Sequence, residues 1–175
     1  MKSPPVTPLP LLPGDCLLYA PPPWSWTPWK VGGWLVGKAI AIKTWNAVTH
    51  CEAYSGQGTS VASRDGIGVG TYPLRLKGLV TILRPTEPFD LTKAHAWFAT
   101  VDGQGYDWTG LLRFVMWGGR STRDDQPSKQ FCSEFLTRWY RRGGLPLFGS
   151  ADADMIAPAQ MLMNDILTPL WSAGP

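Results

Sequence analysis

The chain has 175 residues, of which 44% are hydrophobic and 17% charged, and its formal net charge is +3. This length and composition suit one globular domain with its own core, and they exclude an intrinsically disordered chain. The charge excess is small, and no run of lysine and arginine interleaved with aromatic residues forms a stripe, so we expect no nucleic-acid partner. The three cysteines have neither framework nor zinc-ligand spacing. We therefore expect no disulfide scaffold, metal site or cofactor, and a reducing compartment.

The first thirteen residues are rich in proline, with prolines at positions 4, 5, 8, 10 and 13. These prolines interrupt the apolar residues, so we expect no signal-peptide core or membrane span, and a location in the cytoplasm or in a virus particle. Residues 1–13 are expected to form an extended polyproline-like arm that docks on the domain or on a protein partner. The domain itself is expected over residues 14–175.

A short predicted strand at residues 16–20 is followed by a loop rich in proline and tryptophan. Trp24, Trp26 and Trp29 crowd this loop, in a chain with ten tryptophans. Two interpretations are open. The tryptophans face a ligand, a membrane or another subunit, or they pack against the prolines and staple the loop.

The remaining elements change from strands to helices along the chain. An amphipathic helix is predicted at residues 31–44, and an antiparallel meander of strands at residues 47–54, 59–64, 66–74 and 78–83. After Pro85 the apolar period becomes helical, with helices predicted at residues 90–98, 107–117, 129–142 and 157–167. Residues 121–128 are the expected mobile loop. Strands followed by helices predict an α+β fold.

Cys132 is the candidate nucleophile. It lies in the segment Phe-Cys-Ser-Glu-Phe, in the first turn of the helix predicted at residues 129–142, for which Ser128 is the candidate cap. Unpaired backbone N–H groups and the helix dipole favour negative charge there, which lowers the pKa of a thiol. The alternative is that Cys132 is a small buried core residue between two phenylalanines.

His50 is the candidate base, because it lies in a predicted strand and the cysteine lies on a helix. Papain-like hydrolases lay a sheet against the cysteine helix, so that an imidazole on a strand takes the thiol proton. The other histidine, His95, lies in a predicted helix among small and aromatic residues, where we expect a packing role. Cys51 is expected to point to the other face of its strand from His50, which leaves it as a weaker second candidate nucleophile.

Five short motifs occur in one order along the chain: Gly-Asp at residues 14–15, Thr-His at 49–50, Gly-Gln-Gly at 56–58, Tyr-Asp-Trp at 106–108 and Phe-Cys-Ser-Glu-Phe at 131–135. In this order the chain resembles the circularly permuted NlpC-type cysteine hydrolases, which include the YiiX and YebB proteins and, more distantly, the lecithin:retinol acyltransferase relatives. The resemblance covers roughly residues 14–170, including Ala-Pro-Ala-Gln-Met at 157–161. It implies a permuted papain-like fold, in which an antiparallel sheet packs against the helix that carries the cysteine.

The resemblance also implies a mechanism: thiolate attack by Cys132 on an amide or ester carbonyl, with His50 as base, and an acyl-enzyme that is hydrolysed or transferred. In that group a polar residue twelve positions past the histidine orients the imidazole. That position here is Ala62, which cannot hydrogen-bond to the ring. Ser63, Ser60, or a backbone carbonyl or water remain as substitutes. Without one, the enzyme would run on a dyad or lose activity.

Three other residues have smaller expected roles. Glu134 resembles the glutamate of the family's Cys-Ser-Glu element, and we expect it to form a structural ion pair or hydrogen bond. Asp15 is expected to fix a turn. Tyr106 either donates its hydroxyl near the developing oxyanion or packs in the core.

Three hypotheses for function follow. The first is a cysteine peptidase or amidase, bacterial or carried by phage, that cleaves an amide bond in cell-wall peptidoglycan peptide, with Arg64, Asp65 and residues 120–125 lining a polar groove. The second is a catalytically silent or accessory domain of a larger assembly such as a virus particle, docked through the arm and the tryptophan-rich loop. The third is a lipid acyl hydrolase or transferase, which that loop and the helix at residues 31–44 would bring to a membrane.

Overall fold

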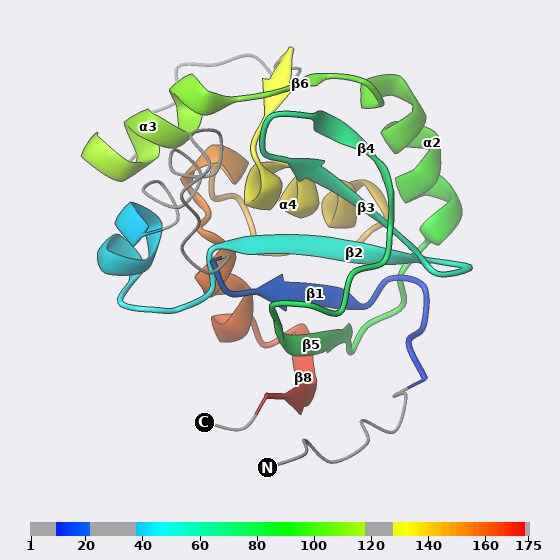
Figure 1. Cartoon of the computed structure of the whole chain (residues 1–175). Helices are drawn as coiled ribbons and strands as arrows, with labels where there is room; N and C mark the ends of the chain where they lie inside the picture. Colours follow the sequence, from blue (N-terminus) through cyan, green and yellow to red (C-terminus); the bar gives the residue numbers. More distant parts are fainter. Residues whose placement is uncertain (1–9, 22–37, 118–127, 174–175) are drawn as a thin grey trace.

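The computed structural model describes residues 10–21, 38–117 and 128–173. Most of the proline-rich arm, the tryptophan-rich loop, the first half of the helix expected at residues 31–44 and the groove segment 120–125 therefore lie outside the described residues. The described part joins a mostly antiparallel sheet to several helices, and the α+β prediction is confirmed at that level (Figure 1).

A six-stranded sheet organises the fold, in the order β4-β3-β2-β1-β5-β8. Every neighbouring pair in it is antiparallel. The first strand lies in the middle of the sheet, between β2 and β5, so the predicted meander is interrupted there (Figure 1). The strands are β1 (Cys16–Tyr19), β2 (His50–Gly56), β3 (Thr59–Arg64), β4 (Gly68–Pro73), β5 (Leu79–Pro85) and β8 (Leu167–Ser172).

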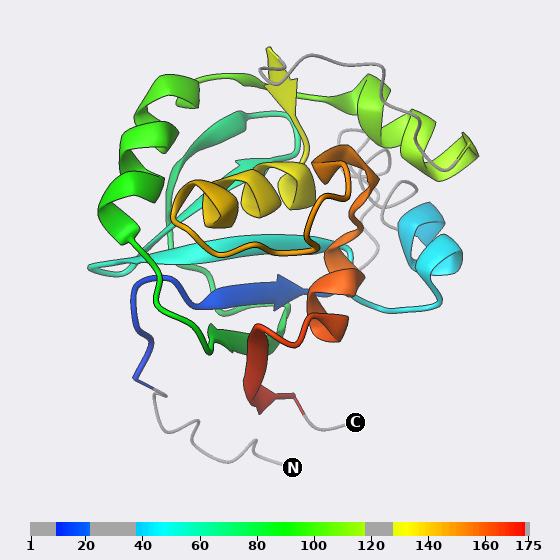
Figure 2. The same cartoon turned by 180° about the vertical axis from the view of Figure 1, so that it is seen from behind.

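One helix, α4 (Cys132–Arg142), crosses one face of this sheet and contacts β2, β3 and α2 (Figure 2). Residues 38–44 are also helical. The smaller sheet is a parallel pair of two-residue strands, β6 (Gly105–Tyr106) and β7 (Lys129–Gln130). The other helical segments are α2 (Leu91–Val101), α3 (Trp108–Trp117) and the 3₁₀ turns η1 (Ala153–Met155) and η2 (Pro158–Met163). No helix among the described residues is long and apolar enough to span a bilayer.

Two predicted helices differ from the structure. The helix expected from residue 129 begins at Cys132, because Lys129 and Gln130 pair with β6 instead. Ser128 does not cap it: Phe131 is the N-cap residue, and the Glu134 carboxylate accepts the N–H of Phe131 at 3.4 Å. The capping glutamate fixes Cys132 as the first helical residue.

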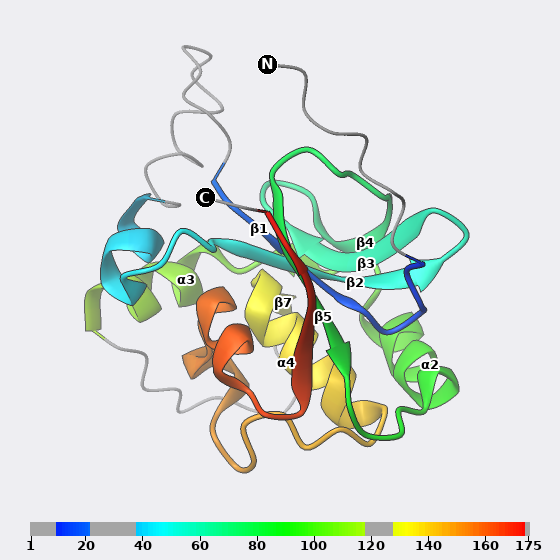
Figure 3. The same ribbon diagram turned by 90° about the horizontal axis from the view of Figure 1, so that it is seen from below.

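The helix expected at residues 157–167 is also wrong. That segment forms η2, and the chain then returns to the sheet as β8, which runs beside β5 (Figure 3). β8 holds Pro169, which lacks a backbone N–H. An edge strand tolerates proline because only one of its sides is paired, so β8 takes the edge of the sheet.

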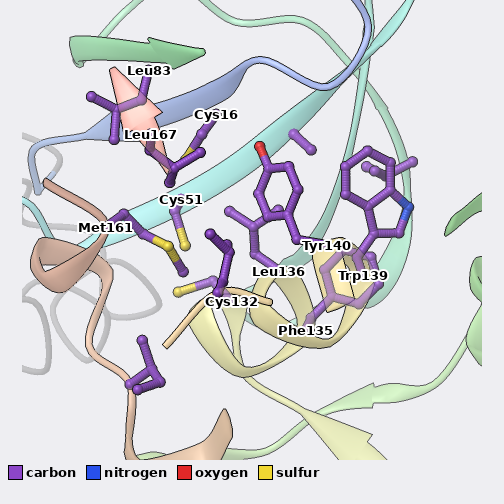
Figure 4. Packing of buried hydrophobic residues seen from close by; sticks show 14 of the residues in the cluster. Cys16, Cys51, Leu83, Cys132, Phe135, Leu136, Trp139, Tyr140, Met161 and Leu167 are labelled. Atoms are coloured by element: carbon purple, nitrogen blue, oxygen red, sulfur yellow. The ribbon is translucent and has the colours of Figure 1, made fainter. Parts of the chain in front are cut away.

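The main core lies between α4 and the sheet. Fully buried side chains of α4 meet buried side chains from β1, β2, β5 and β8 (Figure 4). Those labelled in the close view are Phe135, Leu136, Trp139 and Tyr140 on the helix, and Cys16, Cys51, Leu83 and Leu167 on the strands. Burial of large aromatic side chains is the main stabilisation of such a layer. The layer holds the first turn of α4 against β2.

The turn before β1 is tied to this core. The Asp15 carboxylate accepts the N–H of Leu12 at 2.8 Å and pairs with Arg84 through both of its oxygens, and the Tyr140 hydroxyl donates to the Gly14 carbonyl at 2.7 Å. The prediction that Asp15 fixes a turn is confirmed.

Candidate active site

Cys132 is the first residue of α4, and its side chain is directed at β2 (Figure 4). It is only 2% exposed. The first turn of a helix leaves backbone N–H groups unpaired and places the positive end of the helix dipole there, so a thiolate is favoured at this position.

His50 is the first residue of β2, and it lies close enough to Cys132 for the charge of Cys132 to raise its pKa. The fold therefore brings together the two residues that the sequence singles out, although 82 positions separate them (132 − 50). The side chain of His50 is 16% exposed, and its Nε2 lies 2.9 Å from Oε1 of Glu52. Because Nε2 is engaged there, Nδ1 is the ring nitrogen left for the sulfur.

Glu52 is the residue that sequence reasoning missed. Its side chain is fully buried, and besides His50 it accepts hydrogen bonds from Ser60 at 2.6 Å and from Nε and Nη2 of Arg64, each at 2.9 Å. Arg75 pairs with the same carboxylate at 3.3 Å, and its guanidinium lies over the Tyr19 ring at 4.6 Å. A buried carboxylate with this many donors is ionised and fixed in orientation.

The expected substitutes for the missing polar residue are corrected by this geometry. Ser60 donates to Glu52 rather than to the imidazole, so it helps to fix the orientation of the Glu52 carboxylate. Ser63 lies on the other face of β3 and donates to the carbonyl of Gln130 at 2.5 Å, because side chains alternate along a strand. Neither serine is the partner of His50.

Ala62 has its own place in this arrangement. The pairing of Ala53 with Val61, continued by one residue, sets Ala62 across from Glu52 on the same face of the sheet. Ala62 is fully buried. Its methyl group leaves room for the carboxylate of Glu52 on the neighbouring strand. The polar group that faces the imidazole has thus moved from β3 to β2.

The pKa values of the three groups shift as expected of an ion pair with an orienting carboxylate. Burial disfavours the charged imidazole, but Cys132 and then Glu52 outweigh it and raise the pKa of His50 to about 9. The pKa of Cys132 is held well below its usual value by a hydrogen bond from Cys51 and by His50, against the opposing effect of burial. Burial also opposes the ionisation of Glu52, yet its contacts with His50, Arg64 and Ser60 hold its pKa well below the usual range. Both shifts favour a thiolate on Cys132 and an imidazolium on His50.

Two more donors surround the sulfur of Cys132. The Cys51 side chain does point away from Glu52, as strand alternation requires, but that is the face on which α4 packs, so its thiol reaches Cys132. Burial, followed by the contact with Cys132, raises the pKa of Cys51 well above its usual value, so it stays a protonated donor. The Tyr106 hydroxyl lies near Cys132, and burial together with the Cys132 charge raises its pKa.

Other singled-out residues hold the frame of the site. Glu134 caps α4 and pairs with Arg138 at 3.2 Å, so the predicted structural contact is confirmed; burial raises its pKa to about 7. His95 packs against Trp139 with ring centroids 5.9 Å apart, in the packing role predicted for it. Among the described residues no group of three or more His, Cys, Asp or Glu is arranged to hold a metal ion.

Of the predicted groove residues, Arg64 is engaged with Glu52. Asp65 is exposed as a residue, but its carboxyl group is partly desolvated, which raises its pKa. The His50 charge lowers this pKa and the Cys132 charge raises it, and the overall shift is upward. Asp65 therefore lies near the site, within reach of the charges of His50 and Cys132. Comparison with protein-family models and with curated proteins found no match to this chain.

Proposed function

We propose that this protein is a cysteine hydrolase of the permuted papain-like type, which cleaves an amide bond through an acyl-enzyme on Cys132. The observation that carries the proposal is the order Cys132, His50, Glu52: the charges of Cys132 and His50 shift each other's pKa, and His50 is held by the Glu52 carboxylate at 2.9 Å. This is the arrangement of nucleophile, base and orienting group that acyl transfer requires.

In the proposed reaction the Cys132 thiolate attacks the carbonyl carbon, and the imidazolium of His50 donates its Nδ1 proton to the departing amine. Neutral His50 then takes a proton from water, which attacks the thioester and frees the cysteine. Glu52 keeps the proton on Nε2 and stabilises the imidazolium each time it forms.

The developing oxyanion needs donors beside the sulfur. The unpaired backbone N–H groups in the first turn of α4 and the Tyr106 hydroxyl supply them. Such donors, when fixed before the reaction, typically contribute about 10²-fold or more to the rate. The proposal therefore gives Tyr106 the catalytic one of its two predicted roles.

We propose peptide as the substrate class, in particular the peptide of cell walls. Asp65 supports this choice, since an exposed carboxylate at the rim attracts an ammonium group beside the scissile carbonyl. Stem peptides of peptidoglycan carry such groups, and neutral acyl lipids do not. A cell-wall substrate fits a bacterial protein or a component of a phage particle.

The test offers the purified protein soluble peptidoglycan fragments and short-chain phospholipids side by side, with Cys132→Ser as the blank. Amine release from the peptide, lost in the blank and weakened by Asp65→Asn through a higher KM, is the expected result. Acyl release from the lipid alone would replace the peptide with a lipid substrate. Equal release in the Cys132→Ser blank, or none from either substrate with an unreactive Cys132, would overturn the hydrolase proposal.

A further inference from the structure

The site contains two cysteines that face each other across the interface of α4 and β2. Figure 4 shows the sulfur atoms of Cys51 and Cys132 directed into the same space. Both belong to one buried cluster, and each acts on the pKa of the other. Both cysteines are free.

The hydrolase proposal uses only one of these sulfurs as a nucleophile. A serine, threonine or backbone group would donate to the thiolate equally well, so hydrogen bonding alone does not require sulfur at position 51. What sulfur adds is the capacity to form a covalent bond with a neighbouring oxidised sulfur.

We propose that Cys51 is a resolving cysteine, which forms a reversible disulfide with Cys132 after a peroxide has oxidised Cys132. The proposal rests on the reactivity of Cys132 that the proposed function also uses, but not on any substrate being cleaved. It assigns the pair a modification site that switches hydrolysis off and protects the nucleophile.

The chemistry balances in two steps. The Cys132 thiolate attacks one oxygen of hydrogen peroxide, which breaks the O–O bond, gives the sulfenic acid and releases hydroxide. The Cys51 sulfur then attacks the Cys132 sulfur, an S–S bond forms, the S–O bond breaks and water leaves with the proton of the Cys51 thiol. Two electrons pass from the cysteine pair to the peroxide. An external dithiol returns them by thiol–disulfide exchange.

The surroundings favour the second step once the first has occurred. Burial contributes most to the raised pKa of Cys51, and the negative charge of Cys132 contributes after it. Formation of the sulfenic acid removes that negative charge. His50 lies near Cys132; its imidazolium gives a proton to the hydroxide released in the first step, and the neutral ring then takes the Cys51 proton and passes it to the departing oxygen, which leaves as water. The two sulfurs are directed into the same space, so closure to the S–S length of about 2 Å needs side-chain rotation with an adjustment of the first turn of α4.

Cys16 is the matched comparison within the same cluster. It is also fully buried and free, but the Tyr140 hydroxyl is its hydrogen-bond partner. Burial raises its pKa far above the usual value of a thiol. We expect Cys16 to stay reduced while the other two cysteines react.

The experiment treats the full chain with a small excess of hydrogen peroxide, without substrate, and then alkylates the remaining thiols under denaturing conditions. Wild-type protein should lose two alkylatable thiols and about 2 Da, and digestion should give a peptide pair joining Cys51 to Cys132. A dithiol should restore both thiols. The Cys16→Ala variant should behave in the same way as the wild type.

The variants Cys51→Ala and Cys51→Ser remove the resolving sulfur, and the serine keeps a donor for the thiolate. Each should instead gain about 32 Da on Cys132, the sulfinic acid, which a dithiol does not reverse. Circular dichroism shows whether each is folded. A wild-type chain that accumulates sulfinic acid as fast as folded Cys51→Ser, or a disulfide that includes Cys16, would overturn the proposal. A disulfide in a protein that cleaves neither peptide nor lipid would refute the hydrolase proposal alone.

Discussion

Replacement of Glu52 by glutamine is the most direct test of the site, because it keeps the size of the side chain and removes its charge. In the folded protein this carboxylate holds Nε2 of His50, Ser60, Arg64 and Arg75. The amide introduced by Glu52→Gln can still accept from one side, but it presents an N–H₂ group on the other. Arg64 loses one acceptor in either orientation of the amide, and His50 or Ser60 loses its acceptor as well.

The loss of stability follows from how exposed each partner is. A buried charge left without its partner costs about 3–5 kcal/mol. Arg64 and Arg75 are 17% and 46% exposed and recover part of their hydration, so the bridge to Arg75 contributes less than the two bonds to Arg64. The hydrogen bond to the His50 ring contributes about 1.5–3 kcal/mol when charged. We expect Glu52→Gln to lower the free energy of unfolding by about 2–4 kcal/mol at neutral pH.

The effect on catalysis is expected to be larger than the effect on stability. Without the carboxylate, the imidazole can take the wrong tautomer, which costs about 10⁴ in kcat where an aspartate is replaced by asparagine in a serine triad. The contact with Cys132 contributes most to the raised His50 pKa and remains, so we expect a loss of about 10²–10⁴ in kcat/KM.

The shifted pKa values predict the direction in which the pH dependence of activity and stability changes in Glu52→Gln. The alkaline limb of kcat/KM reports loss of the His50 proton near pH 9, and it should move to lower pH in Glu52→Gln because one of the groups that raise this pKa is gone. For stability, Glu52 is held below its usual pKa of 4.5 in the folded state, so its contribution is present above that pH and lost as pH falls further. The variant should therefore show a flatter fall in stability on acidification.

Glu87→Gln is the matched control, since Glu87 is exposed. It should change neither the urea midpoint nor the pH profile. A Glu52→Gln variant that keeps the alkaline limb of the wild type, measured on a folded sample, would show that Glu52 does not act on His50, and the orienting role would be wrong.

Three further outcomes are expected. Iodoacetamide should label Cys132 before Cys51 or Cys16, with a rate that falls off at a lower pH than that of a free thiol because its pKa is lowered; earlier labelling of another cysteine would exclude it as the nucleophile. Tyr106→Phe should lower kcat/KM by about 10²-fold with little change in melting temperature, if its hydroxyl serves the oxyanion; an unchanged rate leaves it a packing role. Ala62→Glu should lower the melting temperature and the activity together, since it buries a second carboxylate beside Glu52; a faster enzyme would contradict the proposed exchange of the polar position.

Local sequence signals identified Cys132 and His50, but they did not predict where α4 begins or that β8 is a strand. The helix around Cys132 and the strand around His50 were predictable because apolar periodicity and strand composition report local structure directly. The start of α4 was predicted too early because Ser128 is a residue type that commonly caps helices. The actual cap is the Glu134 side chain, which accepts the N–H of Phe131 three residues before it. The strand β8 was missed because its partner β5 is remote in sequence and because a proline, here Pro169, is unfavourable in most strands.

The orienting residue was missed for a different reason. Glu52 is charged and lies inside a strand, and a lone acidic residue there is usually read as solvent-exposed. The signal that would have found it is the spacing: residues two apart on a strand share a face, so Glu52 faces the same side as His50. Two arginines follow within the next hairpin and strand, at positions 64 and 75, and both reach its carboxylate.

The sequence led us to expect a polar partner of His50 at position 62, but Glu52 on the neighbouring strand contacts the imidazole instead. An apolar residue at position 62 alone is therefore weak evidence for lost activity. In an antiparallel sheet, the side chains of two residues directly across from each other are neighbours on the same face and share the space above it. A carboxylate can therefore reach the imidazole from either strand, provided that the residue opposite is small. The small side chain of Ala62 leaves the space that the Glu52 carboxylate occupies. Loss of the orienting group would need both positions to be apolar, and here Ser60, Arg64 and Arg75 form a cage of donors around the buried Glu52 carboxylate. Because such a cage would be costly to keep around an apolar residue, its presence supports a site whose imidazole is still held for proton transfer.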